Sequence, residues 1–229
     1  MGINLFIPKD HLFIAFGITT TYIGNNMNQD RFKQVIHLID AVNNEDPNKE
    51  IVDNREWPKE RLYSDRMSTM LERFNPSANE LLKIAVHGQH IQRWKSLRSD
   101  YPIGKQGYHQ WRTNLYTFHA NSVADLMIKA GYQPGEVEQV KDAVGKKAIK
   151  RNANSQLVED VASLVFIEYY MLAFVQKNPQ YSEEKWIGII LKTWNKMSDD
   201  AHKFVLAGNI VLLESLQSLI MKAIKNNRT

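Results

Sequence analysis

The sequence predicts an all-α fold built as a single-domain helical bundle, and three observations support this. Apolar residues recur at helical spacing in one segment after another. Proline, glycine or capping residues separate these segments. Beyond Met27 no segment alternates convincingly between apolar and polar residues, so we expect no strand there.

The first half of the chain contains three helical patterns. The first has the apolar stripe Phe32, Val35, Ile36, Ile39 and Val42. It should end at Pro47, because proline disfavours helix in the residue before it, and the polar residues 48–58 should form a loop. A second stripe comprises Tyr63, Met67, Met70, Leu71 and Phe74. Ser77 and Glu80 have capping-box spacing, which predicts a third helix that runs to about Trp94.

The second half continues in the same way. After a loop at Tyr101–Gly107, a long helix should cover about residues 108–131, and a short one should follow Pro134. The most apolar helix is expected at Val158–Val175. Ser182 should cap the next helix, and two more helical segments complete the chain.

Residues 1–26 are predicted to be an N-terminal extension, or the result of a start placed too early, and residues 27–229 to form the single helical domain. An extra strand or helix packed on the domain is the alternative. The apolar stretch 11–24 is far too short for a membrane span. It has neither a basic region before it nor a small-residue cleavage pattern after it, which argues against a signal peptide.

The chain contains no cysteine, which excludes disulfides, thiolate metal sites and cysteine nucleophiles. This is compatible with a reducing compartment, and we expect a cytoplasmic protein without a membrane partner. The net charge of +4 is localised, because residues 93–112 and 141–151 each contain five basic residues and one acidic residue. The remainder is net acidic, so the basic segments suggest an anionic partner.

Polar residues at core positions are the main candidates for a functional site. His87 and His90 are three residues apart and should share a helix face, where they could chelate a metal or form a hydrogen-bonded pair near the helix end. His119 lies on the apolar face of the long helix, where it could be a ligand or a hydrogen-bonded core histidine. Asp40 and Asn43 are expected to cap neighbouring helices.

The apolar helix carries three acidic residues, Glu159, Asp160 and Glu168, of which the last two are the further candidates. An isolated buried charge is costly, so Glu168 should be paired, protonated or bound to a cation. A salt bridge from Glu168 to Arg93 or Arg112 would explain a buried carboxylate at this position equally well. Two histidines and two carboxylates from three helices could together bind zinc, iron or manganese. A metal there could polarise a phosphoryl oxygen and generate hydroxide from water.

The basic segment 93–112 also contains aromatic residues, a combination that suits phosphates and stacked bases. Within it, the candidate substrate-binding residues are Arg93, Lys105, Arg112 and Trp94. A solvated basic surface with its aromatic residues in the core is the alternative.

Several phrases occur in order over about Asn28–Ser198, among them DRFKQVIHLIDAVNNEDPN, LYSDRMSTMLERF, QHIQRW, YPIGKQGYHQWR, FHANSVADLMIKAGY, LVEDVASLVFIEYY and LKTWNKMS. In sequence and spacing they resemble an uncharacterised family, the domain of unknown function "forty-two-oh-two", whose members are sometimes labelled glutamyl-tRNA synthetase-like. The resemblance implies no established activity. The chain shows no nucleotide-binding α/β pattern and no class-defining synthetase motif that would support the label.

The order of helices also resembles, more distantly, that of HD-domain metal-dependent phosphohydrolases. The resemblance implies that His90, in AVHGQHIQRW, occupies the histidine position of the His-Asp pair. It implies that His119, in FHANSVADL, is a further ligand found in some members, and that Asp160, in VEDVASL, is the late aspartate ligand.

The chain departs from the HD pattern at two ligand positions. Ile91 stands where the pair has its aspartate, and the early helix offers Asp65 in place of a histidine. The usual ligand set therefore cannot form. Either Asp65, Glu168 or His87 substitutes, or the metal is lost and the scaffold serves another purpose.

Three functions remain open at this point. The first is an enzyme with a divalent metal (iron, zinc or manganese) that hydrolyses a phosphorylated small molecule or nucleotide, with Glu168 as a further ligand or base. The second is an iron-dependent oxidase or oxygenase on the same scaffold. The third is a non-catalytic helical module that binds RNA or another partner. We favour the first.

Overall fold

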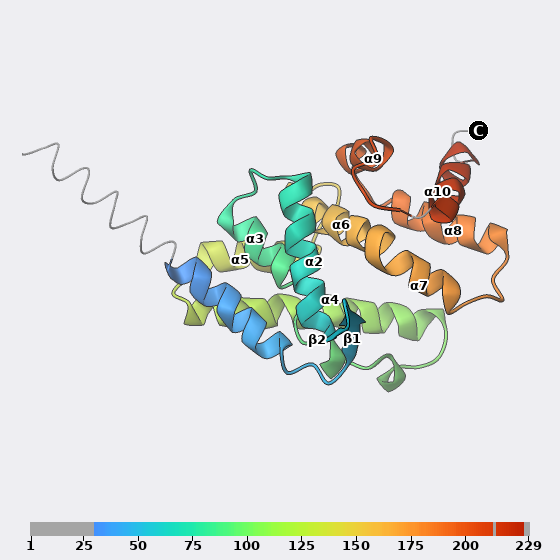
Figure 1. Ribbon diagram of the computed structural model, residues 1–229. Coiled ribbons are helices and arrows are strands. Elements are labelled where there is room, and N and C mark those ends of the chain that lie inside the picture. Colours follow the sequence, from blue (N-terminus) through green and yellow to red (C-terminus); the bar gives the residue numbers. More distant parts are fainter. Residues whose placement is uncertain (1–29, 213, 227–229) are drawn as a thin grey trace, which may run out of the picture.

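The computed structural model describes residues 30–212 and 214–226, whose arrangement is shown in Figure 1. The predicted all-α fold is confirmed, because helices form nearly all of the regular structure in these residues and only a two-stranded hairpin interrupts them. The predictions for residues 1–26 lie outside the described residues. No helix in the described part of the chain is long and apolar enough to cross a membrane.

A helix over residues 30–43, here called the N-terminal helix, leads into the hairpin of β1 (Lys49–Val52) and β2 (Arg55–Pro58). The next two helices are α2 (Lys59–Phe74) and α3 (Glu80–His87). The later helices are α4 (Lys105–Lys129), α5 (Pro134–Val144), α6 (Ala153–Val165), α7 (Met171–Gln176), α8 (Glu183–Trp194), α9 (Asp199–Leu206) and α10 (Glu214–Asn226).

The hairpin corrects the prediction of a loop at residues 48–58. Asp53 and Asn54 have φ angles of 51° and 61°, as a tight two-residue hairpin turn requires, and Asp and Asn tolerate this conformation better than most residues. The strands pair antiparallel over their whole length. They are short and largely exposed, so they contain too few apolar residues to show the alternation of a strand.

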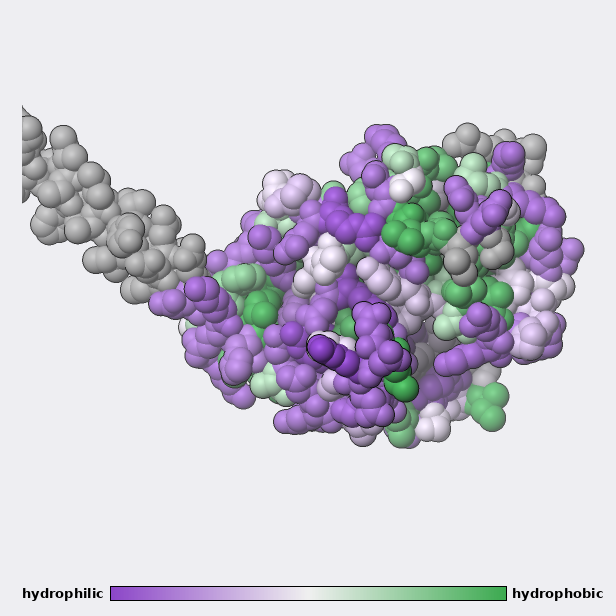
Figure 2. Space-filling view, viewed as in Figure 1, coloured by the Kyte–Doolittle hydropathy of each residue, from purple (hydrophilic) through white to green (hydrophobic). Residues whose placement is uncertain are grey.

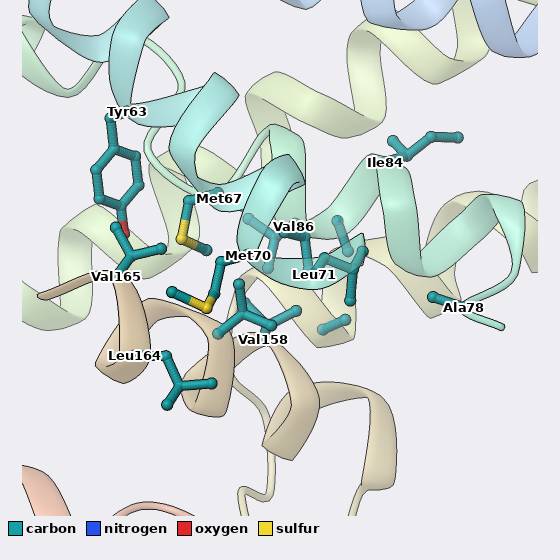
Figure 3. Packing of buried hydrophobic residues seen from close by; sticks show 14 of the residues in the cluster. Tyr63, Met67, Met70, Leu71, Ala78, Ile84, Val86, Val158, Leu164 and Val165 are labelled. Atoms are coloured by element: carbon teal, nitrogen blue, oxygen red, sulfur yellow. The ribbon is translucent and has the colours of Figure 1, made fainter. Parts of the chain in front are cut away.

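The core lies between α2, α3 and α6, where the predicted apolar stripes meet (Figure 3). Met67 and Met70 of α2 are fully buried, and Met70 lies beside Val158 and Leu164 of α6. On the other side, α5 packs against α3, α4 and α6. These contacts fix the positions of the helices that surround the cavities described below.

The end of α3 differs from the prediction. The helix ends at His87 and not near Trp94, and a series of tight turns follows. Its N-cap is Asn79, whose side chain accepts the Leu82 N–H, so the predicted capping box at Ser77 was wrong. As a result, His87 and His90 do not lie on one helix face.

The apolar helix predicted at Val158–Val175 is divided. A π-helical turn over Phe166–Tyr170 separates α6 from α7. Because π turns hold more residues than α turns, they change which residues share a face. The predicted cap of α8 is confirmed, since the Ser182 side chain accepts the Lys185 N–H.

Candidate functional site

A cavity of about 520 Å³ opens between α2, the turns after α3, α4 and α6. Five basic side chains line it, Lys59, Arg93, Arg112, Lys146 and Lys196, against two acidic ones, Glu60 and Glu159. Its aromatic lining comprises Tyr63, Tyr108, Phe166, Tyr170 and Phe174. The volume suits a small molecule, and the surplus of basic charge suits an anion. We call this space the basic cavity.

Two of the basic residues are positioned by left-handed backbone. Gln92, which precedes Arg93, has a φ of 52°, and Lys146 has a φ of 54°. Such angles are uncommon in residues other than glycine, and the surrounding structure must offset their cost. At the first position, the Gln92 N–H donates to Asn43 Oδ1 at 2.9 Å. Asn43 therefore anchors the turn that presents Arg93, and does not cap a helix as expected.

Lys146 and Glu159 form a buried ion pair in the wall of the basic cavity. Their Nζ and Oε2 atoms lie 2.5 Å apart, and the two side chains are only 4% and 6% exposed. Although burial favours the neutral carboxyl, Lys146 and Lys196 hold the pKa of Glu159 below its usual range. Glu159 thus neutralises Lys146 and leaves Arg93 and Arg112 to face a ligand.

Glu60 is the second carboxyl of the basic cavity, and its pKa is shifted upward, whereas that of Glu159 is shifted downward. It is only 5% exposed, and burial raises its pKa to about 7 in spite of the opposing charges of Arg93 and Lys59. Its Oε2 atom lies 3.5 Å from His90 Nδ1. A carboxyl that titrates near neutrality can both give and take a proton at physiological pH.

His90 forms a flat, neutral part of the cavity wall. Its ring stacks on Tyr63, with 4.1 Å between ring centroids and 16° between ring planes. Burial, reinforced by the positive charge of Arg93, lowers the pKa of His90 well below its usual value. The Tyr63 hydroxyl donates to Gln89 Oε1 at 2.9 Å, which holds the stack in place.

Of the predicted metal ligands, His90 and His119 lie close together, with 5.7 Å between their ring centroids, whereas Asp160 lines a different cavity. Within the described residues, no group of three or more His, Asp or Glu side chains is placed to hold a metal ion. His119 Nδ1 donates to the Ile91 carbonyl oxygen at 2.8 Å, as in a core histidine. Asp160 Oδ1 accepts the Ser198 N–H at 2.7 Å and does not line the basic cavity. In this arrangement the three residues do not form the metal centre that the HD resemblance implies, and the metal assignment stays a prediction.

Glu168, predicted as the catalytic residue, is fully engaged elsewhere. Its carboxylate accepts two hydrogen bonds from Arg73, at 2.7 and 3.1 Å, and the Val211 N–H at 2.9 Å. Although burial favours the neutral acid, these donors hold its pKa below the usual range. The alternative of a structural salt bridge describes Glu168 correctly, with Arg73 as its partner and not Arg93 or Arg112.

Two of the four predicted substrate-binding residues line the basic cavity. Arg93 and Arg112 do so, and Arg112 is held by a hydrogen bond from its Nη2 to the Tyr116 hydroxyl at 2.7 Å. Lys105 is exposed at the start of α4 and Trp94 is half-buried, and neither lines the cavity.

The model of one family matches residues 33–220, which is most of the chain. The chain belongs to the family Domain of unknown function (DUF4202). This confirms the resemblance carried by the sequence phrases. No curated protein and no solved structure matches the chain. The DUF4202 match includes every residue that lines the basic cavity.

In this DUF4202 chain, sequence reasoning assigned no site role to Glu60, Lys146 or Glu159. Glu60 lies in a polar stretch at the start of α2, where an exposed side chain is the ordinary expectation. Lys146 belongs to a basic run that resembles solvated surface. The one available signal was Glu159, a charged residue within the most apolar helix, next to the more conspicuous Asp160.

Proposed function

We propose that this chain is an enzyme that binds a phosphorylated small molecule with a planar group, such as a nucleotide, in the basic cavity and hydrolyses its phosphate ester. One observation carries the proposal. Glu60, whose pKa is raised to about 7 by burial, faces a small cavity with more basic than acidic side chains. Anion-binding groups and a proton-transfer group therefore share one space.

Binding would use the two arginines and the aromatic wall. Guanidinium groups form paired hydrogen bonds with phosphate oxygens, so Arg93 and Arg112 suit the non-bridging oxygens of the ester. The Arg93 guanidinium lies 5.1 Å from the Trp111 ring centroid, a cation–π contact that limits its movement. The aromatic side chains Phe166 and Tyr170 offer apolar area for a planar group.

Hydrolysis would use Glu60 as the general acid. A bound phosphate dianion adds negative charge near Glu60, which favours its protonated form. Glu60 donates this proton to the leaving oxygen as the P–O bond breaks and water attacks phosphorus. One water proton stays on the phosphate product and the other returns to Glu60, so the enzyme is regenerated. The arginines stabilise the charge on the non-bridging oxygens.

We retain the distant likeness to HD-domain phosphohydrolases for the arrangement of the helices. We do not use it for the reaction mechanism. Since Asp160 does not join His90 and His119 in one group, neither a metal-dependent hydrolase nor an iron-dependent oxidase gains support from the ligand placement. RNA binding is less favoured because Arg98 donates to the Tyr101 and Pro102 carbonyl oxygens, at 3.0 and 2.9 Å. The Arg98 side chain thus stabilises the loop that contains Tyr101 and Pro102, and its donors are used there.

The binding step is tested by calorimetric titration of the full chain with AMP and with adenosine. We expect AMP to bind at least tenfold more tightly than adenosine, and Arg93→Ala to remove this preference. Lys95→Ala, which removes an exposed charge from the same segment outside the cavity, is the matched control and should leave the affinity unchanged. Equal affinities for AMP and adenosine, or salt-dependent RNA binding that Arg93→Ala leaves intact, would contradict the proposal.

The chemical step is tested by turnover of p-nitrophenyl phosphate in the presence of EDTA. Glu60→Gln should lower kcat at least a hundredfold while AMP still binds, because the amide keeps the shape of the carboxyl but cannot donate its proton. Turnover that requires added metal, or that Glu60→Gln leaves intact, would show that Glu60 is not the acid.

A further inference from the structure

Three side chains from three different helices form a hydrogen-bonded chain outside the basic cavity. Ser68 Oγ of α2 lies 2.8 Å from His87 Nδ1 at the end of α3. His87 Nε2 lies 2.7 Å from Asp40 Oδ1 of the N-terminal helix. His87 is 4% exposed, so both ring nitrogens depend on these partners. The sequence placed these residues in separate segments and suggested no connection between them.

The direction of the hydrogen bonds follows from what each group can donate. A carboxylate can only accept, and Asp40 Oδ1 forms an ion pair with Arg61 Nε at 3.1 Å. His87 therefore carries its proton on Nε2 and leaves Nδ1 as an acceptor. The Ser68 hydroxyl must then donate to His87. A serine that donates to a histidine held by a carboxylate has the arrangement of an activated nucleophile, although the two ring nitrogens exchange the roles they have in serine proteases.

These three hydrogen-bonded side chains border a cavity of a size that suits a small substrate. Ser68, His87 and Asp40 line a second cavity of about 480 Å³ between the N-terminal helix, α2 and α3. The same cavity is lined by Phe32, Ile36 and Leu71. In Figure 2 an apolar patch, coloured green, is visible between the N-terminal helix and α2, with hydrophilic residues around it. We call this space the serine cavity.

We propose that the serine cavity is a second reactive site, at which Ser68 attacks the carbonyl carbon of a small carboxylic ester with an apolar acyl group. The apolar side chains would hold the acyl group. Ser68 lies in the middle of α2, whose backbone N–H groups are used within the helix, so they cannot stabilise the oxyanion. Lys33 and Lys83 line the cavity and supply the positive charge for that role. This proposal does not depend on the function of the basic cavity.

The reaction balances without a further reactant other than water. As Ser68 Oγ bonds to the carbonyl carbon, its proton passes to His87 Nδ1. The ester C–O bond then breaks, and His87 returns the proton to the leaving alkoxide, which departs as the alcohol. Water attacks the acyl-serine in the same manner, which releases the acid and restores Ser68. Asp40 acts as a positioning residue, since its hydrogen bond with Nε2 fixes the His87 ring.

The first test uses a fluorophosphonate probe and p-nitrophenyl butyrate with the full chain. We expect covalent labelling at Ser68, identified by peptide mass spectrometry, and ester turnover that falls at least a hundredfold in Ser68→Ala. Thr69→Ala changes an exposed hydroxyl on the next residue of the same helix and should change neither. Absence of labelling, or labelling that persists in Ser68→Ala, would overturn the proposal.

The second test uses the absence of cysteine from the chain. Ser68→Cys introduces the only thiol, and proximity to His87 should make it a thiolate at neutral pH. We expect its alkylation by iodoacetamide at pH 7 to be at least tenfold faster than that of the exposed control Thr69→Cys. Adding Asp40→Asn should move the pH of half-maximal alkylation upward, because the imidazolium loses its carboxylate partner. Slower alkylation of Ser68→Cys than of the control would show that His87 does not activate this position.

Discussion

His87 and His90 are three residues apart in the sequence, yet they occupy opposite kinds of environment. His87 is hydrogen-bonded through both ring nitrogens, at 2.8 Å to Ser68 and 2.7 Å to Asp40. His90 has only long polar contacts, 3.5 Å to Glu60 and 3.4 Å to Arg93, and stacks on Tyr63. The first histidine is fixed by hydrogen bonds, and the second by burial and ring stacking.

The difference follows from where α3 ends. Side chains three apart lie together only while the helix continues, and α3 stops at His87. Gly88 then allows the chain to turn tightly against α4, since a Cβ at that position would lie 2.5 Å from Val123 Cγ2. Two histidines that suggested one chelating pair are thereby separated, one toward the serine cavity and one toward the basic cavity.

We expect the largest effect on stability at the buried ion pair of Lys146 and Glu159, in the wall of the cavity that His90 also lines. Lys146→Met should lower the free energy of unfolding by about 3–5 kcal/mol, because it leaves the buried Glu159 carboxylate without its main partner. Urea unfolding followed by circular dichroism measures this. The double variant Lys146→Met with Glu159→Leu should recover most of the loss, since it removes both charges. A double variant no more stable than the single one would contradict this account.

The pH dependence of stability distinguishes Glu60 from the carboxylates that form salt bridges. The pKa of Glu60 rises from an ordinary value of 4.5 to about 7 on folding, so the folded state binds the proton more tightly. Its contribution is therefore fully present below pH 4.5 and is lost as the pH rises to about 7, by about 3 kcal/mol. The free energy of unfolding should be measured for the wild type and for Glu60→Gln at several pH values between 4.5 and 7. A difference between the two that stays constant would show that burial does not shift Glu60.

The fold was predictable from the sequence to the extent that it depends on local pattern. The apolar stripe of α2 and the cap at Ser182 each involve a few neighbouring residues, and the structure confirms both. The sites were harder to predict because they depend on where chain segments meet. Glu60, for example, lies where distant segments meet, since Asp46 Oδ2 accepts its N–H at 3.0 Å and His90 Nδ1 lies 3.5 Å from its Oε2.

Conspicuous residues were also misleading for a physical reason. Asp160 and Glu168 lie in an apolar helix, and the rule that a buried charge needs a partner holds for both. Asp160 accepts one hydrogen bond from Gln156 on its own helix, but the Ser198 N–H and Arg73 come from distant segments that the sequence does not place. The burial of a charge was thus foreseeable, whereas the identity of its partner was not.

Replacing His87 or His90 should have an intermediate effect on the free energy of unfolding. His87→Phe should lower the free energy of unfolding by about 2 kcal/mol, because Asp40 and Ser68 lose their shared partner in a partly buried place. His90→Phe keeps a flat ring on Tyr63 and removes only long polar contacts, so it should cost less than about 1 kcal/mol. Thermal unfolding of both variants in one buffer tests this order. If His90→Phe were the more destabilising, the contrast between the two environments would be wrong.

The smallest effect on stability is expected for Ser68→Ala. It removes one hydrogen bond and a half-buried hydroxyl, for which about 1 kcal/mol or less is typical, and alanine partly offsets the loss through its higher helix propensity. A reactive serine differs from a structural one in this respect, since the same substitution should remove labelling and ester turnover almost completely. Measuring both quantities on the same sample separates the two roles. A loss of several kcal/mol with little change in labelling would mean that Ser68, His87 and Asp40 hold three helices together and perform no chemistry.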